Sequence, residues 1–554
     1  MSRKVVSVIM LTIPLTSMFT VVFGVQPVRA TGTIYTNPSA HASLYENGFW
    51  NVATQNIDWW LMYRHDPQHT SYSTSKAPNI NRTLWIKQFG DWIRSSPTVH
   101  NNVVFIGADD GPSRGGVYAL NGTTGEQIWN YTTGGDVISS AAVVYDRVYF
   151  GSYDRKLYCL DETNGKLLWS FQTGDIVYSS PCVAENKVVF GSNDHKLYCL
   201  DAITGNHLWN FSTWEAVYSS PAVANGKVFF GSCDANIYAL DLTNGTLIWS
   251  YSTDGSITVS PSVLDGKVFI SSSNTIYCFD ASDGDLIWSY AAVGTIHSSP
   301  ATAEGNVFIG SNDHKMYCLS AVNGQLKWTF TTGDIIYSSP AVADGKLFFG
   351  SNDKKVYCLN ATTGKLVWSY NTGGEIKTSC PAVAQRVIFV ASNYYPPFSG
   401  RLFAFGRLAN TPPVTVNLTV TPPSPVTTDN LIGHYDYYDE DGDPENGTEI
   451  RWYKNDILQS EYNGTLEIPQ SATTKGETWC FTVRPKDGED FGGLQTSSLV
   501  TIQNSPPSVE NVTITPDPAY KNDTLIANPS GWFDVDGDPE AYFYQWQRYE
   551  EAVD

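Results

Sequence analysis

The sequence predicts an all-β protein: an eight-bladed β-propeller whose last blade is closed by an N-terminal strand, followed by β-sandwich modules, the last one incomplete. Two repeating signals and the composition support this fold class. Tryptophan and a Ser-Pro element each recur about every 40 residues. Aromatic residues make up 13% of the chain and charged residues only 16%, with 45 glycines and 29 prolines. This composition suits many short strands joined by tight turns.

The first 30 residues read as a signal peptide. Arg3 and Lys4 precede an uncharged run from Val5 to Val28, and Val28-Arg29-Ala30 offers small residues at the two positions that matter for cleavage. We therefore expect a secreted or cell-surface, extracytoplasmic protein. The alternative is an uncleaved anchor, because the uncharged run is long for a signal peptide. Residues 31–81 form a lead-in segment.

One repeat shows how a blade is built. The unit runs from Ser338-Ser339-Pro340 through Lys346–Gly350 and Val356–Leu359 to the strand around Trp368. Each run is rich in β-branched and aromatic residues and is bounded by turn formers, which indicates four strands per unit. A four-stranded unit near 40 residues is typical of a propeller, whereas independent sandwiches need about 100 residues each.

The phase of the repeat predicts how the ring closes. Both the Ser-Pro element, with its variants, and the tryptophan strand occur eight times, but Trp85 precedes the first Ser-Pro element and the last unit, 378–407, has no tryptophan strand. We therefore expect Thr83-Leu84-Trp85-Ile86 to complete the last blade. The propeller then spans residues 82–407, has no free strand edge and is monomeric.

Nine cysteines give no disulfide framework. Five of them occupy one place in the third strand of successive units, too far apart to pair, and we interpret them as small buried hydrophobes. They are Cys159, Cys199, Cys278, Cys318 and Cys358.

A carboxylate also recurs at one place of the blade. We interpret it as a turn residue that binds backbone N–H groups, and a ring of carboxylates binding cations or substrate is the alternative. His195 and His314, which follow two of these residues, are expected to be turn residues. The carboxylates are Asp154, Asp194, Asp234, Asp313 and Asp353.

The units resemble the pyrroloquinoline-quinone (PQQ) repeat, with their Gly-Ser-x-Asp, Leu-Tyr-Cys/Ala-Leu-Asp, Thr-Gly and Trp pattern. The stretch from Trp59 to Pro78, with Arg64-His65-Asp66-Pro67, resembles the segment that leads into such propellers. The resemblance covers residues 59–407. It implies the fold but not the function, because the repeat builds both quinoprotein dehydrogenases and a non-enzymatic outer-membrane-assembly lipoprotein.

Features of the quinoprotein enzymes are missing from the sequence. The resemblance implies, for an enzyme, adjacent disulfide-bonded cysteines and a calcium ion beside the quinone, but the nearest cysteines here are Cys182 and Cys199. The units are also uniform, without long insertions that could cap a pocket. The sequence thus predicts no catalytic residue, argues against catalysis and against bound PQQ, and predicts no cofactor firmly.

Two further modules follow the propeller, at 410–504 and 505–554. They begin at Thr411-Pro412-Pro413 and Ser505-Pro506-Pro507. In the first, a strand around Trp452 followed by Trp479-Cys480-Phe481 resembles immunoglobulin-like modules of surface proteins. The second stops before the strands that would complete a sandwich, so we expect the chain to be a fragment.

Each module carries an acidic loop in which carboxylates alternate around a glycine. Such loops can wrap a hard cation through oxygen ligands, so calcium is our hypothesis for a metal site, and a solvated turn is the alternative. The candidate ligands are Asp439, Asp441, Asp443 and Glu445 in the first module and Asp534, Asp536, Asp538 and Glu540 in the second.

The net charge of the chain and its glycosylation sequons reduce the number of functions that fit the sequence. A net charge of -21 excludes a nucleic-acid reader, which needs clustered Lys and Arg. Numerous Asn-x-Ser/Thr sequons, such as Asn130 and Asn210, favour a glycoprotein. We expect a non-enzymatic binding or scaffold protein with a protein or glycan partner at the cell surface. The alternatives are a PQQ-dependent dehydrogenase and a carbohydrate-active protein, which would need a cleft with paired carboxylates.

Overall fold

A computed structural model describes residues 58–109, 114–395, 398–407, 410–520 and 522–547. The predicted signal peptide lies outside these ranges. Within them, no helix is both long and apolar enough to cross a membrane.

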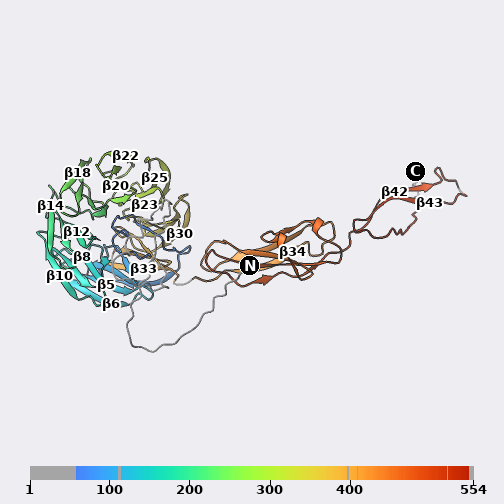
Figure 1. The fold of residues 1–554 in the computed structure, drawn as a ribbon, viewed down its shortest axis with the longest axis horizontal. Helices are drawn as coiled ribbons and strands as arrows, with labels where there is room; N and C mark the ends of the chain where they lie inside the picture. The colour runs from blue at the N-terminus through green and yellow to red at the C-terminus, as the bar shows by residue number, and fades with distance from the viewer. Residues whose placement is uncertain (1–57, 110–113, 396–397, 408–409, 521, 548–554) are drawn as a thin grey trace, which may run out of the picture. The chain divides into compact units, whose positions relative to one another are not determined.

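Eight four-stranded units radiate around one axis, as the ring of sheets in Figure 1 shows. Blades 1 to 8 are numbered here by their innermost strands in chain order. These are β3 (Thr98–His100), β7 (Ala142–Val144), β11 (Cys182–Ala184), β15 (Ala222–Ala224), β19 (Ser262–Leu264), β23 (Ala301–Ala303), β27 (Ala341–Ala343) and β31 (Ala382–Ala384).

The second and third strands of each blade form its buried centre. The second strands are β4 (Val103–Asp109), β8 (Arg147–Gly151), β12 (Lys187–Ser192), β16 (Lys227–Gly231), β20 (Lys267–Ser272), β24 (Asn306–Gly310), β28 (Lys346–Gly350) and β32 (Val387–Tyr394). The third strands are β5 (Gly115–Asn121), β9 (Lys156–Asp161), β13 (Lys196–Asp201), β17 (Asn236–Asp241), β21 (Thr275–Asp280), β25 (Lys315–Ser320), β29 (Lys355–Asn360) and β33 (Ser399–Gly406). Four consecutive residues of a third strand are typically buried, because neighbouring blades cover both faces.

The outer strands alternate between exposed and buried residues, as expected at a rim. They are β6 (Gln127–Thr133), β10 (Leu167–Gln172), β14 (His207–Ser212), β18 (Leu247–Ser252), β22 (Leu286–Ala291), β26 (Leu326–Thr331), β30 (Leu366–Asn371) and, in blade 8, β2 (Thr83–Gln88).

Strand β2 closes the ring as predicted. It pairs antiparallel with β33, with Thr83 opposite Phe405 and Trp85 opposite Ala404. Blade 8 is thus assembled from the two ends of the propeller segment. A short strand before it, β1 (Tyr72–Ser73), pairs in parallel with β27 of blade 7.

Each tryptophan of the repeat links its blade to the next. The indole Nε1 of Trp209 donates to the carbonyl oxygen of Leu242 at 3.0 Å. Gly245, in the turn after Leu242, has φ +72°, and a Cβ there would lie 2.6 Å from the Trp209 ring. The same indole bond recurs at all eight tryptophans, with partners Gly122, Glu162, Ile203, Leu242, Ala281, Ala321, Ala361 and Pro78.

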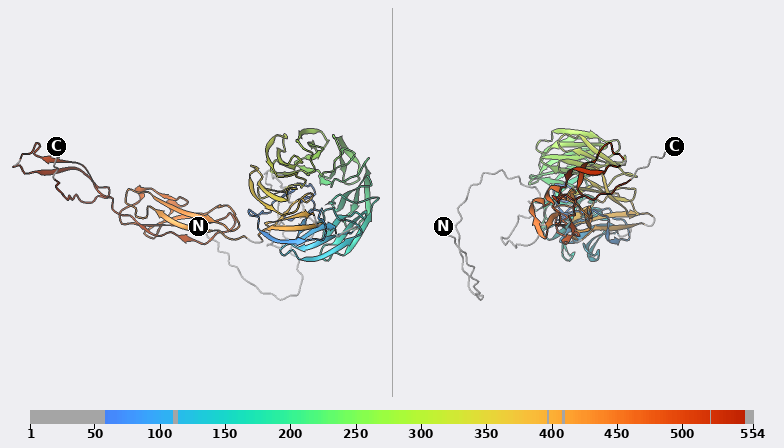
Figure 2. Two further views of the ribbon diagram at one scale, coloured as in Figure 1. Left: turned by 180° about the vertical axis from the view of Figure 1, so that it is seen from behind. Right: turned by 90° about the vertical axis from the view of Figure 1, so that its right-hand side faces the viewer.

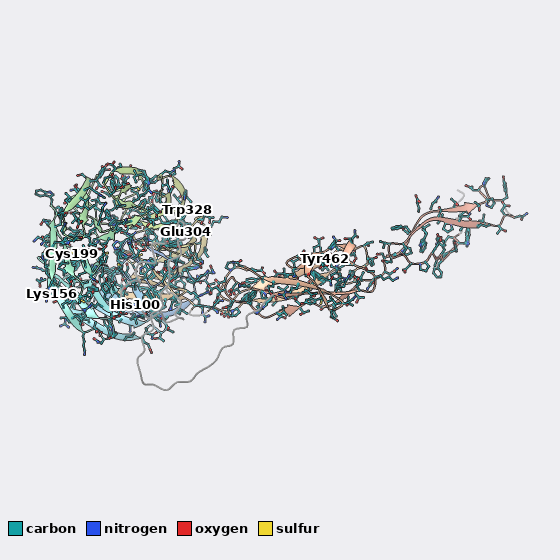
Figure 3. The ribbon with its side chains drawn as sticks, in the orientation of Figure 1. His100, Lys156, Cys199, Glu304, Trp328 and Tyr462 are labelled. Atoms are coloured by element: carbon teal, nitrogen blue, oxygen red, sulfur yellow. The ribbon has the colours of Figure 1, made fainter. Side chains whose placement is uncertain are left out.

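The cysteine prediction is confirmed. All nine thiols are free, and the five repeated ones are fully buried. Figure 3 labels Cys199 in blade 3 and Trp328 in blade 6.

A belt of serine hydroxyls joins the inner strands. In the Ser-Ser-Pro element, the second serine donates its backbone N–H to the hydroxyl of the equivalent serine one blade on, as Ser180 does to Ser220 at 2.9 Å. The same bond joins blades 1 to 7 in succession, and the N–H of Cys380 in blade 8 returns to Ser96 at 2.9 Å. Seven of the eight belt positions therefore hold a serine hydroxyl, and the eighth holds the thiol of Cys380.

Beyond the propeller, two sheets, drawn in orange in Figure 2, follow in the chain. They share one apolar core. Buried Trp452, Trp479 and Phe481 pack in this core against Leu431 and Ile468 of the facing sheet. One sheet holds β34 (Val414–Thr421), β35 (Leu431–Tyr438) and β38 (Glu467–Ile468); the other holds β36 (Glu449–Lys454), β37 (Ile457–Gln459), β39 (Thr478–Arg484), β40 (Gln495–Thr496) and β41 (Val500–Thr501). Two 3-10 turns, η2 (Ser460–Tyr462) and η3 (Gln470–Ala472), lie between strands.

A two-stranded ladder follows, β42 (Ser508–Thr515) with β43 (Ile526–Phe533). Every residue of β42 is exposed.

Candidate functional site

Residues 58–76, called here the axial segment, run along the inner strands of the propeller. Its backbone carbonyls accept N–H groups from the inner strands of six blades. For example, Trp60 accepts from Val99 of blade 1, and Ser71 accepts from Val342 of blade 7. The remaining donors in order are Val143, Val223, Val263 and Thr302. Sequence reasoning identified a lead-in here but missed this position at the centre of the ring.

The axial segment carries a buried polar cluster. Arg64 is fully buried and donates from Nε to the hydroxyl of Ser71 at 3.0 Å and from a terminal nitrogen to the carbonyl of Pro261 at 3.0 Å. His65 lies between Asp58, at 3.0 Å, and Asp66, at 3.2 Å. Protein groups therefore fill the ring at this level.

The cluster shifts the ionisation of its members. Burial lowers the pKa of His65, but the bonds to Asp58 and Asp66 outweigh it and raise the pKa to about 9. Burial opposes ionisation of Asp58 as well, yet its bonds with His65 and Thr74 lower the pKa to about 2. Burial and the Arg64 charge lower the pKa of His69 to about 3.

One face of the propeller, called here the mouth face, is made by two sets of loops. One set joins each outer strand to the next inner strand, and the other joins the second and third strands of each blade. The residue just before Ser-Ser in the first set is aromatic in four blades: Tyr178, Tyr218, His297 and Tyr337. The three tyrosines are half-buried and His297 is exposed.

These rings lie in contact from blade to blade. Tyr178 and Tyr218 have ring centroids 5.2 Å apart with planes at 79°, and His297 stacks on Tyr337 at 4.7 Å and 25°. The hydroxyl of Tyr63, from the axial segment, lies 3.5 Å from Ser299 Oγ of the serine belt. Burial and the neighbouring Tyr63 and Tyr218 raise the pKa of Tyr178.

The mouth face also exposes large apolar side chains. Trp214 is 85% exposed and Val293 is 81% exposed. In blade 8, Tyr395 and Phe398 are 72% and 53% exposed, with centroids 4.8 Å apart. Phe398 in turn lies 5.3 Å from Trp92. Single exposed apolar residues are ordinary, but the contacting rings of Trp92, Phe398 and Tyr395 form a continuous apolar patch, as binding surfaces do.

Three asparagines of the mouth face have a side-chain oxygen that is buried yet has no hydrogen-bond partner among the described residues. They are Asn193, Asn312 and Asn352, at one position of the repeat, and Asn352 is 9% exposed. The backbone N–H of Asn352 donates to Ile335, two residues before Tyr337. These amides thus lie beside the loops that carry the aromatic rings.

The repeated aspartates are turn residues, as interpreted. Asp194 Oδ2 accepts the backbone N–H of Gly174 and the hydroxyl of Tyr198, both at 2.7 Å. The tyrosine bond recurs at Asp154, Asp234, Asp313 and Asp353. His195 is exposed and His314 half-buried, both in the turn with positive φ.

The acidic loop of the first module brings three of its four candidate ligands together. Carboxylate oxygens of Asp439, Asp441 and Asp443 lie within 4.8 Å of one another. Oδ1 of Asp439 accepts the N–H groups of Asp441 at 2.7 Å and Asp443 at 3.0 Å, while its Oδ2 is buried and has no partner among the described residues. Glu445 instead accepts the hydroxyl of Tyr435 at 2.8 Å.

Basic residues already approach this loop. Arg407 Nε lies 2.7 Å from Asp441 Oδ1, and an Arg386 nitrogen lies 3.3 Å from Asp443 Oδ2. Burial and the charges of Asp443 and Asp441 nonetheless raise the pKa of Asp439, although its bonds to the backbone N–H groups of Asp443 and Asp441 oppose the rise.

The second module repeats the geometry. Asp534, Asp536 and Asp538 lie within the same distance, and Asp534 Oδ1 accepts the N–H groups of the other two. Its Oδ2 is again buried, with no partner in the described part of the chain. Glu540 is bound by the Tyr542 hydroxyl and stays outside the cluster.

A second contact also repeats between the loops. Asp441 Oδ2 accepts the N–H of Thr411 at 2.6 Å, and Asp536 Oδ2 accepts that of Ser505 at 2.7 Å, each at the start of its module.

Comparisons with known proteins agree with this fold. A family model described as "Beta-alanine-activating enzyme, beta-propeller" matches residues 183–394, and one described as "Outer membrane protein assembly factor BamB" matches residues 78–173. No curated protein sequence matches the chain.

Several solved structures are similar. A europium-containing methanol dehydrogenase has a TM-score of 0.54 at 13% identity over 63% of this chain and 98% of its own. The quinohemoprotein alcohol dehydrogenase of Comamonas testosteroni has a TM-score of 0.54 at 14% identity over 65% and 82%. BamB of Moraxella catarrhalis is 19% identical over 58% and 97%, with a TM-score of 0.49. The chain therefore contains a PQQ-type β-propeller, and at these identities the likeness extends to the fold alone.

Proposed function

We propose that this chain is a secreted or cell-surface binding protein without enzymatic activity, whose propeller presents the mouth face to a protein or glycan partner. The observation that carries the proposal is the concentration of exposed aromatic side chains there, with Trp214 at 85% and Tyr395 at 72%. Aromatic residues are enriched where proteins bind partners, because they bury a large area at low entropic cost.

The axial segment supports binding through the loops. It occupies the inner strands with its own backbone and with Arg64, His65 and Trp60, all buried. A partner therefore meets the loops of the mouth face, and the modules beyond residue 410 act as immunoglobulin-like spacers.

The binding proposal can be tested by capture from cell-surface extracts with the full chain. Trp214→Ala and Tyr395→Ala should each reduce the captured partner at least tenfold without changing Tm. The control is Tyr145→Ala, an equally aromatic change in the turn between β7 and β8, on the opposite face, where Tyr145 is 40% exposed. Equal capture by all three variants, or no specific capture, contradicts the proposal.

A second proposal concerns the acidic loops, which we assign to calcium. The supporting observation is the buried oxygen at the first aspartate of both loops, Asp439 and Asp534, which has no partner among the described residues. Calcium takes six to eight oxygen ligands, and three carboxylates in reach of one point supply the charged part of such a shell. Arg407 and Arg386 compete for two of these carboxylates in the first module.

Calcium titration of the full chain, followed by calorimetry and by Tm, tests this assignment. Calcium should raise the Tm of the C-terminal transition by several degrees, and the double change Asp439→Asn with Asp534→Asn should abolish the shift. Glu445→Gln, which alters a carboxylate outside the cluster, should keep it. No binding heat with the unmodified chain contradicts the assignment.

A further inference from the structure

The aromatic rings around the mouth stand at equivalent positions of blades 3, 4, 6 and 7. Each precedes the Ser-Ser pair, whose second serine forms the belt around the axis. The rings therefore encircle the same axis, in two contacting pairs: Tyr178 with Tyr218 and His297 with Tyr337. Tyr63 of the axial segment lies beside this level, next to Ser299.

We infer that the partner of the mouth face is an uncharged glycan, whose sugar rings stack on these aromatic side chains and whose hydroxyls donate to the free amide oxygens of Asn193, Asn312 and Asn352. This inference rests on the proposed binding function and names the chemistry of its ligand.

Stacking explains the ring geometry. Half-buried tyrosines are held by their neighbours, so little side-chain entropy is lost when a flat apolar surface covers them. Sugar rings present such surfaces on their C–H faces and are polar at their edges. The aromatic rings can cover the C–H faces, and hydrogen-bonding groups are needed for the polar edges.

The asparagines supply the hydrogen-bonding part. An amide oxygen buried without a donor costs free energy until a donor reaches it. Asn193 already directs its amide nitrogen to the Tyr218 hydroxyl at 3.5 Å, which leaves its buried oxygen as the group without a partner among the described residues. Asn312 lies beside the His297 loop through a bond from its N–H to Thr295. Acceptors thus stand beside aromatic faces in three blades.

Several of the charged groups nearby already have partners, which favours a neutral ligand. The Arg94 guanidinium lies 5.0 Å over the Trp92 ring and 3.6 Å from Asp109. Lys377 pairs with Glu375 at 2.8 Å, and Asp353 Oδ2 accepts from Gly333 and Tyr357. To bind one of these groups, a charged glycan would have to displace its present partner.

An array of neutral oligosaccharides (malto-, cello-, xylo- and mannohexaose), read with the full chain and followed by calorimetry on the best binder, tests the inference. We expect one series to bind, and Tyr178→Ala and Tyr218→Ala each to weaken it at least tenfold. Asn352→Ala should weaken it several-fold. Tyr145→Ala on the opposite face should leave the affinity unchanged, and Tm should identify any variant that is merely unfolded.

The outcomes separate the two proposals. If none of the neutral sugars binds while Trp214-dependent capture of a surface partner persists, the glycan inference is overturned and the binding function stands. If sulfated or uronic oligosaccharides bind tighter than neutral ones, the inference is likewise overturned. If neither sugars nor any surface partner bind, both proposals fail.

Discussion

At the scale of the residue, the glycine in the turn after the third strand of blades 1 to 7 meets two requirements at once, a positive φ and room for an indole ring. Gly245 adopts φ +72°, a conformation that L side chains rarely take, and its missing side chain makes room for Trp209 of the preceding blade. The tryptophan period reveals the blades in the sequence, but it does not reveal that seven of the eight indoles rest on a glycine 35 to 40 residues further on, in the next blade.

Replacing Gly245 by alanine should therefore destabilise the propeller by about 2–4 kcal/mol, the sum of a left-handed backbone penalty and overpacking. Gly266 is the matched control, because it has φ +71° but no atom lies within 4 Å of the place where its Cβ would stand. Gly266→Ala should cost only about 1–2 kcal/mol. Urea unfolding followed by tryptophan fluorescence measures both, and equal losses would mean that the indole contact contributes nothing.

The same scale explains which site residues could be anticipated. The role of the repeated aspartates followed from their turn chemistry, and the acidic loops from their alternating carboxylates. The aromatic rings of the mouth face were missed, because their position varies between repeats: it holds Arg94 in blade 1, Ile138 in blade 2 and Tyr178 in blade 3. Variation at one place in an otherwise uniform repeat was the signal available.

At the scale of the element, the inner strands are short and are joined around the axis by the serine belt. Seven belt positions hold serine, and the eighth holds Cys380, whose thiol lies 3.5 Å from the carbonyl of Pro381. The eight-blade count and the closing strand β2 were predictable, because each depends on local patterns repeated along the chain. The belt was not, because it is made by side chains in different blades.

Replacing the cysteine of the belt by serine tests the contribution of the belt, because the replacement should increase the stability of the propeller. Cys380→Ser places a hydroxyl where the N–H of Ser339 can reach it, and should stabilise the propeller by about 0.5–1.5 kcal/mol. Cys380→Ala removes the thiol without adding an acceptor and should not stabilise. Thermal unfolding compares the two variants with the unmodified chain, and a serine variant no more stable than the alanine variant refutes the role of the belt.

At the scale of the whole molecule, the axial segment is the feature that sequence reasoning placed least well. It is held by hydrogen bonds in which its backbone carbonyls accept N–H groups from the inner strands of six blades, from Val99 in blade 1 to Val342 in blade 7. No periodic pattern marks such contacts, because backbone groups are common to every residue. The sequence does place Trp60, Arg64 and His65 close together, and all three side chains are buried in the structure.

The buried histidines of this segment predict a stability maximum near pH 6.5. The pKa of His65 is raised to about 9, so its contribution is complete below pH 6.5 and is lost as the pH rises towards 9. The pKa of His69 is lowered to about 3, so its contribution is complete above pH 6.5 and is lost as the pH falls. Asp58, with a pKa near 2, adds to the loss below pH 4.

Calorimetry between pH 4 and pH 9 should show both losses. His65→Gln should flatten the alkaline side of the Tm profile and His69→Gln the acid side, each relative to its own maximum. Profiles that keep their shape in both variants would assign the pH dependence to other groups.

The hydrogen bonds of the axial segment also constrain the order of assembly. A ribosome makes residues 58–76 before any blade, yet Ser71 finds its donor, Val342, only when the first strand of blade 7 has been made. The backbone carbonyls of this early segment therefore cannot all form their native hydrogen bonds until most of the propeller has been made. Refolding should accordingly end in a slow step in which the nearly complete ring encloses its own beginning.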